Sequence, residues 1–261
     1  MQQLYFNSQG QGETLVLVHG LCEDSRVWDT IFAALQAKHR VVSVDMAGFG
    51  KSPLDGSKEL ESIDDIADRL AFTLQQNGIQ KCCLVGHSMG GYVTLAFAQK
   101  YPDMLTGWGL FHSTAYADTD EKKENRLKQA EFVGENGTEP FVKVLIPSLF
   151  AASQNHTAQI ENSLARAKEC TPFGIMNALL AMRQRPERLD VLKTSKVPVL
   201  IIAGAEDGVI PVDKLSYQAS LPQRCQFELF EKSGHMGMVE EPQKSINVLN
   251  NFMAFCNAAN Q

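Results

Sequence analysis

The stretch Val85-Gly86-His87-Ser88-Met89-Gly90-Gly91 places one serine among three glycines, directly after an apolar run and directly before a segment of helical character. A strand that turns at once into a helix holds the residue between them in a strained backbone conformation, which glycine neighbours permit because they let backbone come close. Such a turn exposes the Ser88 hydroxyl at the edge of a sheet. The pattern predicts a nucleophilic serine, provided that the chain also supplies a base.

Short apolar runs rich in β-branched residues recur along the chain and are typical of buried strands in a largely parallel sheet. They cover Thr14–Val18, Arg40–Val44, Cys82–Val85, Trp108–Phe111, Val197–Ala203 and Cys225–Phe230. Helical patterns alternate with them over residues 62–77, 91–101 and 242–255. Ser62 and Asp65 have the spacing of a capping box, and Gly78 ends that helix. The alternation predicts an α/β fold with a doubly wound, mostly parallel sheet.

The strand rhythm stops between residues 113 and 190, where charged and apolar residues follow helical spacing over residues 122–133, 141–150, 156–169 and 173–185. Glycine and proline lie between these segments, as expected at helix boundaries. We therefore predict a core formed by residues 1–112 and 191–261, and a helical cap, or lid, formed by residues 113–190.

A serine hydroxyl needs a base and a group that orients the base. His235 follows the Cys225–Phe230 strand, and Asp207 follows the Val197–Ala203 strand. The carboxyl ends of parallel strands bind ligands in open α/β sheets, so Ser88, Asp207 and His235 are the predicted catalytic residues. Glu206 and Asp213 remain alternative acids because they lie close to Asp207 in the sequence.

Two backbone N–H groups are predicted to form an oxyanion hole. Met89 opens the helix after Ser88, so its N–H has no partner within the helix. Leu21 follows His19-Gly20 at the end of the first predicted buried strand and is the candidate for the second donor.

Five segments in this order resemble the motifs of the α/β-hydrolase superfamily: HGLCEDSRVW, VDMAGFGKS, GHSMGG, AGAEDGVIP and SGHMGMVEEP. The chain is most similar to the serine-nucleophile branch with a helical cap, including small bacterial esterases and enol-lactonases of the 3-oxoadipate type. This resemblance implies an α/β-hydrolase fold and the catalytic order Ser88, Asp207, His235.

The resemblance implies hydrolysis of a small carboxylic ester, lactone or similar acyl bond through an acyl-enzyme. Carbon–carbon bond hydrolases, thioesterases and perhydrolases with the same triad remain alternatives, as does a slow-turnover ligand receptor of the same fold. The substrate pocket is predicted to be apolar, because aromatic and methionine side chains suit adaptable apolar sites. Its candidate residues are Phe111, Tyr116, Phe141, Phe150 and Met236.

Several other residues are assigned structural roles. His19 and His87 flank the predicted site and are interpreted as structural, and Asp45 as an acceptor that braces its loop. Arg183 and Arg185 could anchor a substrate carboxylate, but a salt bridge or a solvated face is the favoured interpretation.

The composition narrows the function classes. The 261 residues are 44% hydrophobic with a formal net charge of −6, and no run has the ~20 apolar residues of a membrane span. This balance argues against nucleic acid and anionic membranes as partners, and favours a small, apolar or weakly polar substrate.

The six cysteines lack metal-ligand spacing, so we predict neither a metal nor another cofactor. The amino terminus lacks the features of a secretory signal, which predicts a cytoplasmic location. The sequence does not predict an oligomeric state.

Overall fold

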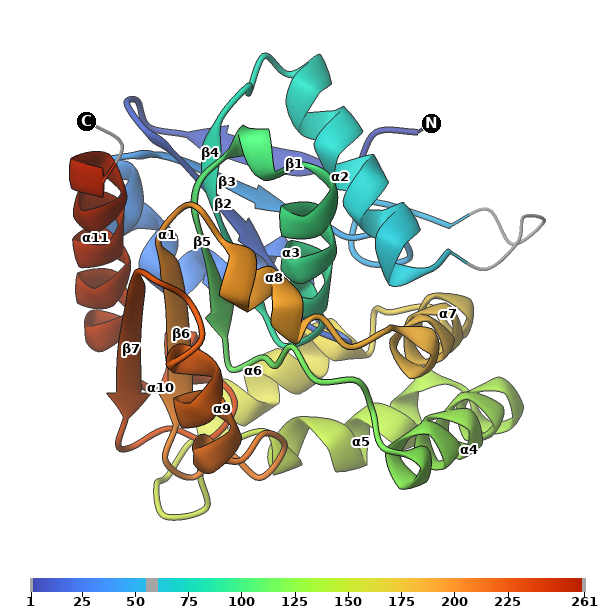
Figure 1. The fold of residues 1–261 in the computed structure, drawn as a ribbon. Coiled ribbons are helices and arrows are strands. Elements are labelled where there is room, and N and C mark those ends of the chain that lie inside the picture. Colours follow the sequence, from blue (N-terminus) through green and yellow to red (C-terminus); the bar gives the residue numbers. More distant parts are fainter. Residues whose placement is uncertain (1, 55–60, 260–261) are drawn as a thin grey trace.

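The computed structural model describes residues 2–54 and 61–259. Its seven-stranded sheet has the order β1-β3-β2-β4-β5-β6-β7 (Figure 1). The strands are β1 (Phe6–Gln9), β2 (Thr14–Val18), β3 (Arg40–Val44), β4 (Cys82–His87), β5 (Leu105–Phe111), β6 (Val199–Gly204) and β7 (Cys225–Phe230). Among these strands only β1 pairs antiparallel, and the other pairs are parallel. The predicted mostly parallel sheet is confirmed.

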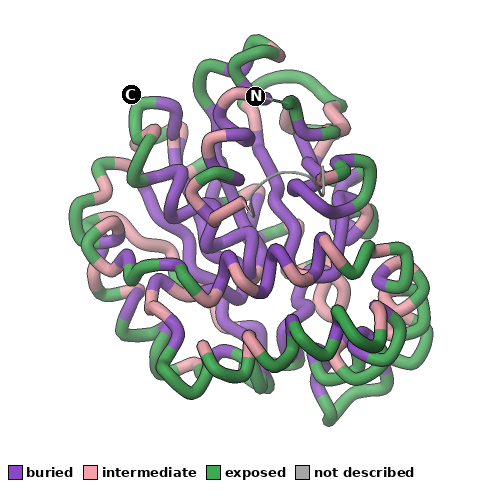
Figure 2. The backbone as a smooth tube through the Cα atoms, turned by 90° about the vertical axis from the view of Figure 1, so that its right-hand side faces the viewer, coloured by how far each residue is buried: buried purple, intermediate pink, exposed green. Residues whose placement is uncertain are grey.

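Helices cover both faces of this sheet, as a doubly wound fold requires. Within the described residues, the helices other than those between β5 and residue 189 are α1 (Asp29–Gln36), α2 (Ile63–Gln76), α3 (Met89–Lys100), α8 (Leu189–Thr194), α9 (Val212–Ala219), α10 (Gly237–Glu240) and α11 (Pro242–Ala259), with short 3-10 turns η1 (Ser25–Trp28) and η2 (Pro102–Met104). In Figure 1, α1 and α11 lie together on one side, and α2, α3 and α8 lie on the other. The central strands are consequently buried, and every residue of β4 and β6 is inaccessible to solvent or nearly so (Figure 2).

Four helices lie between β5 and α8 in the chain: α4 (Asp120–Asn136), α5 (Thr138–Ser148), α6 (Thr157–Ala167) and α7 (Pro172–Gln184). They pack on one another, α4 against α5 and α7, and α5 against α6. Figure 1 shows them together beyond the carboxyl ends of the strands. Their helical nature is confirmed, whereas the division into a core and a cap stays a prediction. The outermost residues of the predicted core, 1 and 260–261, lie outside the described residues.

The sequence prediction missed β1, α1, α8, α9 and α10. The β1 sequence FNSQ is polar, because this strand pairs with β3 at the edge of the sheet and is not buried on both faces. The six-residue α8 is too short for a helical stripe to be recognised. Elsewhere the boundaries move by a few residues. For example, the run predicted over Val197–Ala203 is the strand Val199–Gly204, and Pro198 precedes it.

Capping explains why α2 begins at residue 63. The Ser62 hydroxyl accepts a hydrogen bond from the Asp65 N–H, and the Asp65 carboxylate accepts one from the Ser62 N–H, so the predicted capping box is present. No helix within the described residues is long and apolar enough to cross a membrane.

Candidate active site

Ser88 occupies the turn between β4 and α3 with φ 50° and ψ −114°, a backbone conformation that few non-glycine residues adopt. Its N–H donates to Phe111 O at 3.0 Å. A β-carbon on Gly86 would lie 2.1 Å from Gly90 O, and one on Gly90 would lie 2.4 Å from Val18 O. The close backbone approach expected of these glycines is therefore present, and it holds Ser88 at the carboxyl end of the sheet.

Asp207 and His235 are brought together from the ends of β6 and β7. Asp207 Oδ2 lies 2.8 Å from His235 Nδ1, and both side chains are buried. Asp207 Oδ1 accepts the N–H groups of Val209 and Ile210 at 2.8 and 3.0 Å. Burial raises the pKa of Asp207, but the charge and hydrogen bond of His235, with smaller contributions from other neighbours, together bring the pKa to about 2. Asp207 is thus a carboxylate at neutral pH, and His235 Nδ1 must carry the shared hydrogen.

The other ring nitrogen of His235 is then an acceptor in the neutral imidazole. His235 Nε2 is buried and has no hydrogen-bond partner among the described residues. The two alternative acids are engaged elsewhere: Glu206 accepts from the N–H and hydroxyl of Ser153, and Asp213 lies in the first turn of α9. Asp207 is the carboxylate that contacts His235.

Ser88 and His235 line one cavity of about 350 Å³, which we call the serine cavity. Ligand pockets are typically of this size or larger. Leu21 lies on its wall, and Met89 is the first residue of α3, where an N–H has no acceptor within the helix. The wall consists of Leu21, Glu23, His87, Ser88, Tyr92, Lys122, Arg126, Gln129, Phe141, Leu145, Leu149, Met182, Gly208, Val209 and His235.

Two of the five predicted pocket residues line a cavity. Phe141 is on the wall of the serine cavity, whereas Met236 lines a second cavity described below. Tyr116 lies outside both of these walls, and its ring is 5.9 Å from the Lys214 ammonium.

Phe111 and Phe150 lie in the core, and neither lines the serine cavity or the second cavity. The Phe111 ring packs edge-on against Trp28 at 5.8 Å. The Phe150 ring lies 5.6 Å from His156. An aromatic residue near a site fills space under the site as readily as it lines the pocket, and sequence spacing does not separate the two cases.

A buried glutamate and histidine connect the predicted oxyanion loop with the loop of His235. Glu23 Oε2 accepts the Gly20 N–H at 2.6 Å and lies 3.0 Å from His87 Nδ1. His87 Nε2 lies 2.8 Å from the carbonyl oxygen of His235. A carbonyl oxygen only accepts, so Nε2 must carry a hydrogen, and an ionised Glu23 requires a second hydrogen on Nδ1.

The electrostatics support a charged pair. Burial raises the pKa of Glu23, but the charge and hydrogen bond of His87, together with the Gly20 N–H and His19, lower it below its ordinary value. Burial lowers the pKa of His87, but the charge and hydrogen bond of Glu23, together with the His235 carbonyl and Asp207, raise it above its ordinary value. We therefore describe the pair as carboxylate and imidazolium. The second carboxylate oxygen of Glu23, Oε1, is buried without a hydrogen-bond partner among the described residues.

The predicted structural roles of His19 and Asp45 agree with their contacts. His19 Nδ1 donates to Gly20 O at 2.8 Å, and Nε2 accepts the Met46 N–H at 2.9 Å, which fixes a neutral ring. Burial lowers the pKa of His19 in the same direction. Asp45 accepts the N–H groups of Ser25 and Lys51, each at 2.8 Å, and so braces two loops.

A further histidine, His112, lies beside the candidate acid. Its Nδ1 is 3.7 Å from Asp207 Oδ2, too long for a hydrogen bond, and neither ring nitrogen has a partner among the described residues. Burial lowers the pKa of His112 well below its ordinary value, so the ring is neutral. His112 leaves Asp207 free to bind His235.

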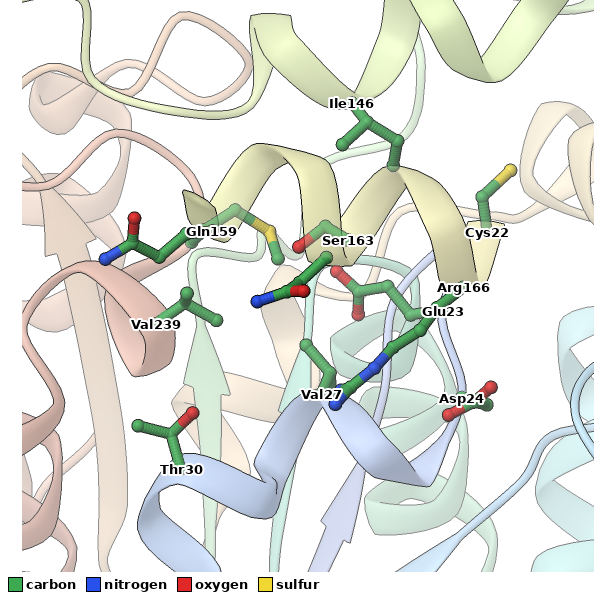
Figure 3. A pocket seen from close by; sticks show the side chains of 12 residues that line it. Cys22, Glu23, Asp24, Val27, Thr30, Ile146, Gln159, Ser163, Arg166 and Val239 are labelled. Atoms are coloured by element: carbon green, nitrogen blue, oxygen red, sulfur yellow. The ribbon is translucent and has the colours of Figure 1, made fainter. Parts of the chain in front are cut away.

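A second cavity, of about 120 Å³, lies on the other side of Glu23, which lines both cavities. Figure 3 shows Ser163 and Arg166 reaching toward it from α6, opposite Val27 and Asp24. Its wall carries several polar groups, and water fits such a space.

Arg185 is a structural residue. Its guanidinium is buried, donates to Asp118 Oδ1 at 2.8 Å and lies 3.8 Å from the centre of the Tyr92 ring. Arg183 donates from Nε to Lys123 O at 3.2 Å. The salt-bridge interpretation of Arg185 is therefore correct.

Within the described residues, no group of three or more histidine, cysteine or acidic side chains is arranged to hold a metal ion.

Sequence reasoning missed four residues that surround the candidate site: Glu23, His112, Lys122 and Arg126. Lys122 and Arg126 could have been found, because their spacing places them on one face of a predicted helix. Glu23 and His112 give no such signal, since their contacts come from loops that only the folded chain brings together.

Several known proteins resemble this chain in sequence or in fold. A family model described as serine aminopeptidase, S33, matches residues 10–242. The fold is similar to that of a thermophilic esterase from Thermogutta terrifontis solved with malate bound, with 32% identity, a TM-score of 0.92 and coverage of 97% of this chain and 93% of that one. The enol-lactonase from Burkholderia xenovorans LB400 has a TM-score of 0.89 at 19% identity, with 96% of each chain covered. A 2-hydroxy-6-oxononadienedioate/2-hydroxy-6-oxononatrienedioate hydrolase from Paraburkholderia phymatum is 29% identical, over 96% of this chain and 91% of the relative.

Proposed function

Because the chain belongs to the hydrolase family described as serine aminopeptidase, S33, and is a hydrolase of the α/β type, we propose that it cleaves a small carboxylic ester or lactone through an acyl-enzyme on Ser88. The observation that carries this proposal is the state of His235. Its Nδ1 is bonded to an ionised Asp207, and its Nε2 is left without a partner in the cavity that Ser88 lines.

In the acylation step, His235 Nε2 takes the proton of the Ser88 hydroxyl as the oxygen attacks the substrate carbonyl carbon. The imidazolium that forms is stabilised by Asp207, which also fixes the ring orientation. His235 then gives its proton to the leaving alcohol oxygen, so that the carbon–oxygen bond of the ester breaks and the acyl group stays on Ser88.

In the deacylation step, the same histidine takes a proton from water as the water oxygen attacks the acyl carbon. His235 then returns this proton to the Ser88 oxygen as the bond between that oxygen and the acyl carbon breaks, which releases the acid and restores the serine hydroxyl. The N–H groups of Leu21 and Met89 are the proposed donors to the oxyanion in both steps. Removing one such donor typically costs about 3 kcal/mol of transition-state stabilisation. The Glu23 side chain supports this arrangement because it holds the Gly20 N–H immediately before Leu21.

The helices α4–α7 are the proposed cap. Phe141 and Leu145 of α5 and Met182 of α7 reach the serine cavity, so this segment supplies the side chains that select the acyl or alcohol part of the substrate. The substrate is proposed to be a small molecule.

Steady-state hydrolysis of 4-nitrophenyl esters of increasing acyl length tests the proposal. The wild-type chain should turn over the esters that fit the cavity, and Ser88→Ala should remove turnover at unchanged far-UV circular dichroism. Ser220→Ala is a matched control, because Ser220 is exposed and its hydroxyl bonds only Tyr217 O among the described residues. Equal turnover by wild type and Ser88→Ala would reject Ser88 as the nucleophile. Absence of turnover on every ester and lactone would reject the proposed substrate class.

A further inference from the structure

One wall of the serine cavity is basic. Lys122, Arg126 and Gln129 lie at positions i, i+4 and i+7 of α4, so they share one face of the helix, and all three line the cavity that contains Ser88 and His235. The Arg126 side chain is mostly buried, with 18% of its surface exposed, whereas Lys122 and Gln129 on either side of it are exposed.

The positive charge of Arg126 is only partly balanced. Its Nε donates to Asp118 Oδ2, and the same carboxylate also accepts from Arg185. Burial raises the pKa of Asp118, but the two arginines outweigh burial and lower the pKa to about 2, so Asp118 is ionised. Two guanidinium groups against one carboxylate leave a positive charge in excess. Among the described residues, the terminal nitrogens of Arg126 have no hydrogen-bond partner.

Lys122 adds a second excess charge. Its ammonium contacts the neutral Val209 O at 3.4 Å, and within the described part of the chain it forms no ion pair. The one carboxylate on the wall of the serine cavity, Glu23, is already paired with His87. The cavity therefore presents, at its α4 side, one ammonium without an ion-pair partner among the described residues, Lys122, and one guanidinium, Arg126, that shares the single carboxylate of Asp118 with Arg185.

From these contacts we infer that the substrate of the Ser88 site carries a carboxylate, and that Arg126 and Lys122 bind it while Ser88 attacks the ester or lactone carbonyl at the other end. This inference rests on the proposed function and deepens it. An arginine with free terminal nitrogens matches the geometry of a carboxylate, and a nearby lysine adds charge without a fixed direction. The small substrate expected from the sequence is thus an anionic one.

The test compares charged and neutral esters of the same acids. The charged substrates are the 4-nitrophenyl half-esters of succinate and glutarate, and the neutral ones are the corresponding 4-nitrophenyl methyl diesters. The measured quantity is the ratio of kcat/KM for the half-ester to kcat/KM for the diester. The wild type should prefer a half-ester, and Lys122→Gln combined with Arg126→Gln should lower this ratio about tenfold or more, the effect of losing hydrogen bonds to a charged group. Lys128→Gln is the control, because Lys128 lies on α4, pairs with Glu124 at 3.5 Å and is absent from the cavity wall.

A second readout is independent of turnover. Glutarate should raise the melting temperature of Ser88→Ala, and this shift should disappear when Lys122→Gln and Arg126→Gln are added. Hydrolysis of the neutral diester without preference for a half-ester, or a preference that survives in the double variant, would overturn the inference and leave the proposed function standing. A glutarate shift in a wild type that hydrolyses no ester would support the carboxylate site and reject the proposed reaction.

Discussion

Replacing Glu23 with glutamine tests the buried charge pair beside the candidate catalytic residues. The glutamine amide keeps the shape of the side chain, and its oxygen can still accept the Gly20 N–H now bonded to Glu23 Oε2 at 2.6 Å. The charge that balances His87 is lost, and a neutral His87 cannot donate both to the introduced amide and to His235 O. Both side chains are at least 94% buried in the wild type, so the remaining partner is left without compensation.

Breaking a buried ion pair by removing one partner typically costs about 3–5 kcal/mol. Because Glu23→Gln retains the contact to Gly20, we expect a loss near the lower limit, about 3 kcal/mol, in the free energy of unfolding. Urea unfolding of Glu23→Gln, His87→Gln and the double variant measures it. The double variant should lose less than the sum of the single losses, since the pair is broken only once. Glu139→Gln is the surface control, and it should change the urea midpoint far less because Glu139 lies in an exposed ion pair with Lys143.

The pH dependence of the free energy of unfolding follows from the directions of the pKa shifts of Glu23 and His87. The lowered pKa of Glu23 contributes stability above the ordinary value of 4.5, and this contribution is lost as pH falls through the folded pKa. The raised pKa of His87 contributes stability below the ordinary value of 6.5, and it is lost as pH rises through the folded pKa. The stability difference between wild type and Glu23→Gln should therefore be largest from pH 4.5 to 6.5. Losses that add within about 0.5 kcal/mol, with no dependence on pH, would refute the charged pair.

The other predictions concern Asp207 and the serine turn. Asp207→Asn should lower kcat by about 10³–10⁴-fold in an ester assay with little change in circular dichroism, because the ring of His235 loses its orienting carboxylate; an unchanged kcat would assign the acid elsewhere. The pKa of Asp207 is lowered from 3.8 to about 2, so its ionised carboxylate stabilises the fold above pH 3.8. Acid-unfolding curves should show this stability being lost as pH falls toward 2, and the curve of Asp207→Asn should not show this loss. Gly86→Ala should yield an inactive or unfolded chain, because its β-carbon would lie 2.1 Å from Gly90 O, and a folded variant with wild-type kcat/KM would contradict the packing described for the turn.

The sheet and the serine turn could be predicted from the sequence because both depend on short-range patterns. Buried parallel strands are continuous apolar runs, and the glycines around Ser88 are required by backbone contacts within a few residues. The Asp207–His235 contact joins the ends of two strands, and it was predictable because neighbouring parallel strands end at the same edge of the sheet.

The aromatic lining of the pocket and the Glu23–His87 pair could not be predicted in the same way. Phe111 and Phe141 are both aromatic and near the site, but one packs on Trp28 and the other faces the serine cavity. That difference is set by how α5 lies over the sheet, which the sequence pattern does not encode. The Glu23–His87 pair is similar, since 64 residues separate partners that meet only when the loop after β2 folds against the end of β4.

The most direct test of the central claim is an intact-mass measurement after reaction with a fluorophosphonate, which forms a stable adduct with an activated serine. One phosphonyl group should be added to the wild-type chain, peptide mapping should place it on Ser88, and Ser88→Ala should remain unlabelled under the same conditions. Labelling of Ser88→Ala at the wild-type rate, or a wild-type adduct mapped to another residue, would contradict the assignment of Ser88 as the nucleophile.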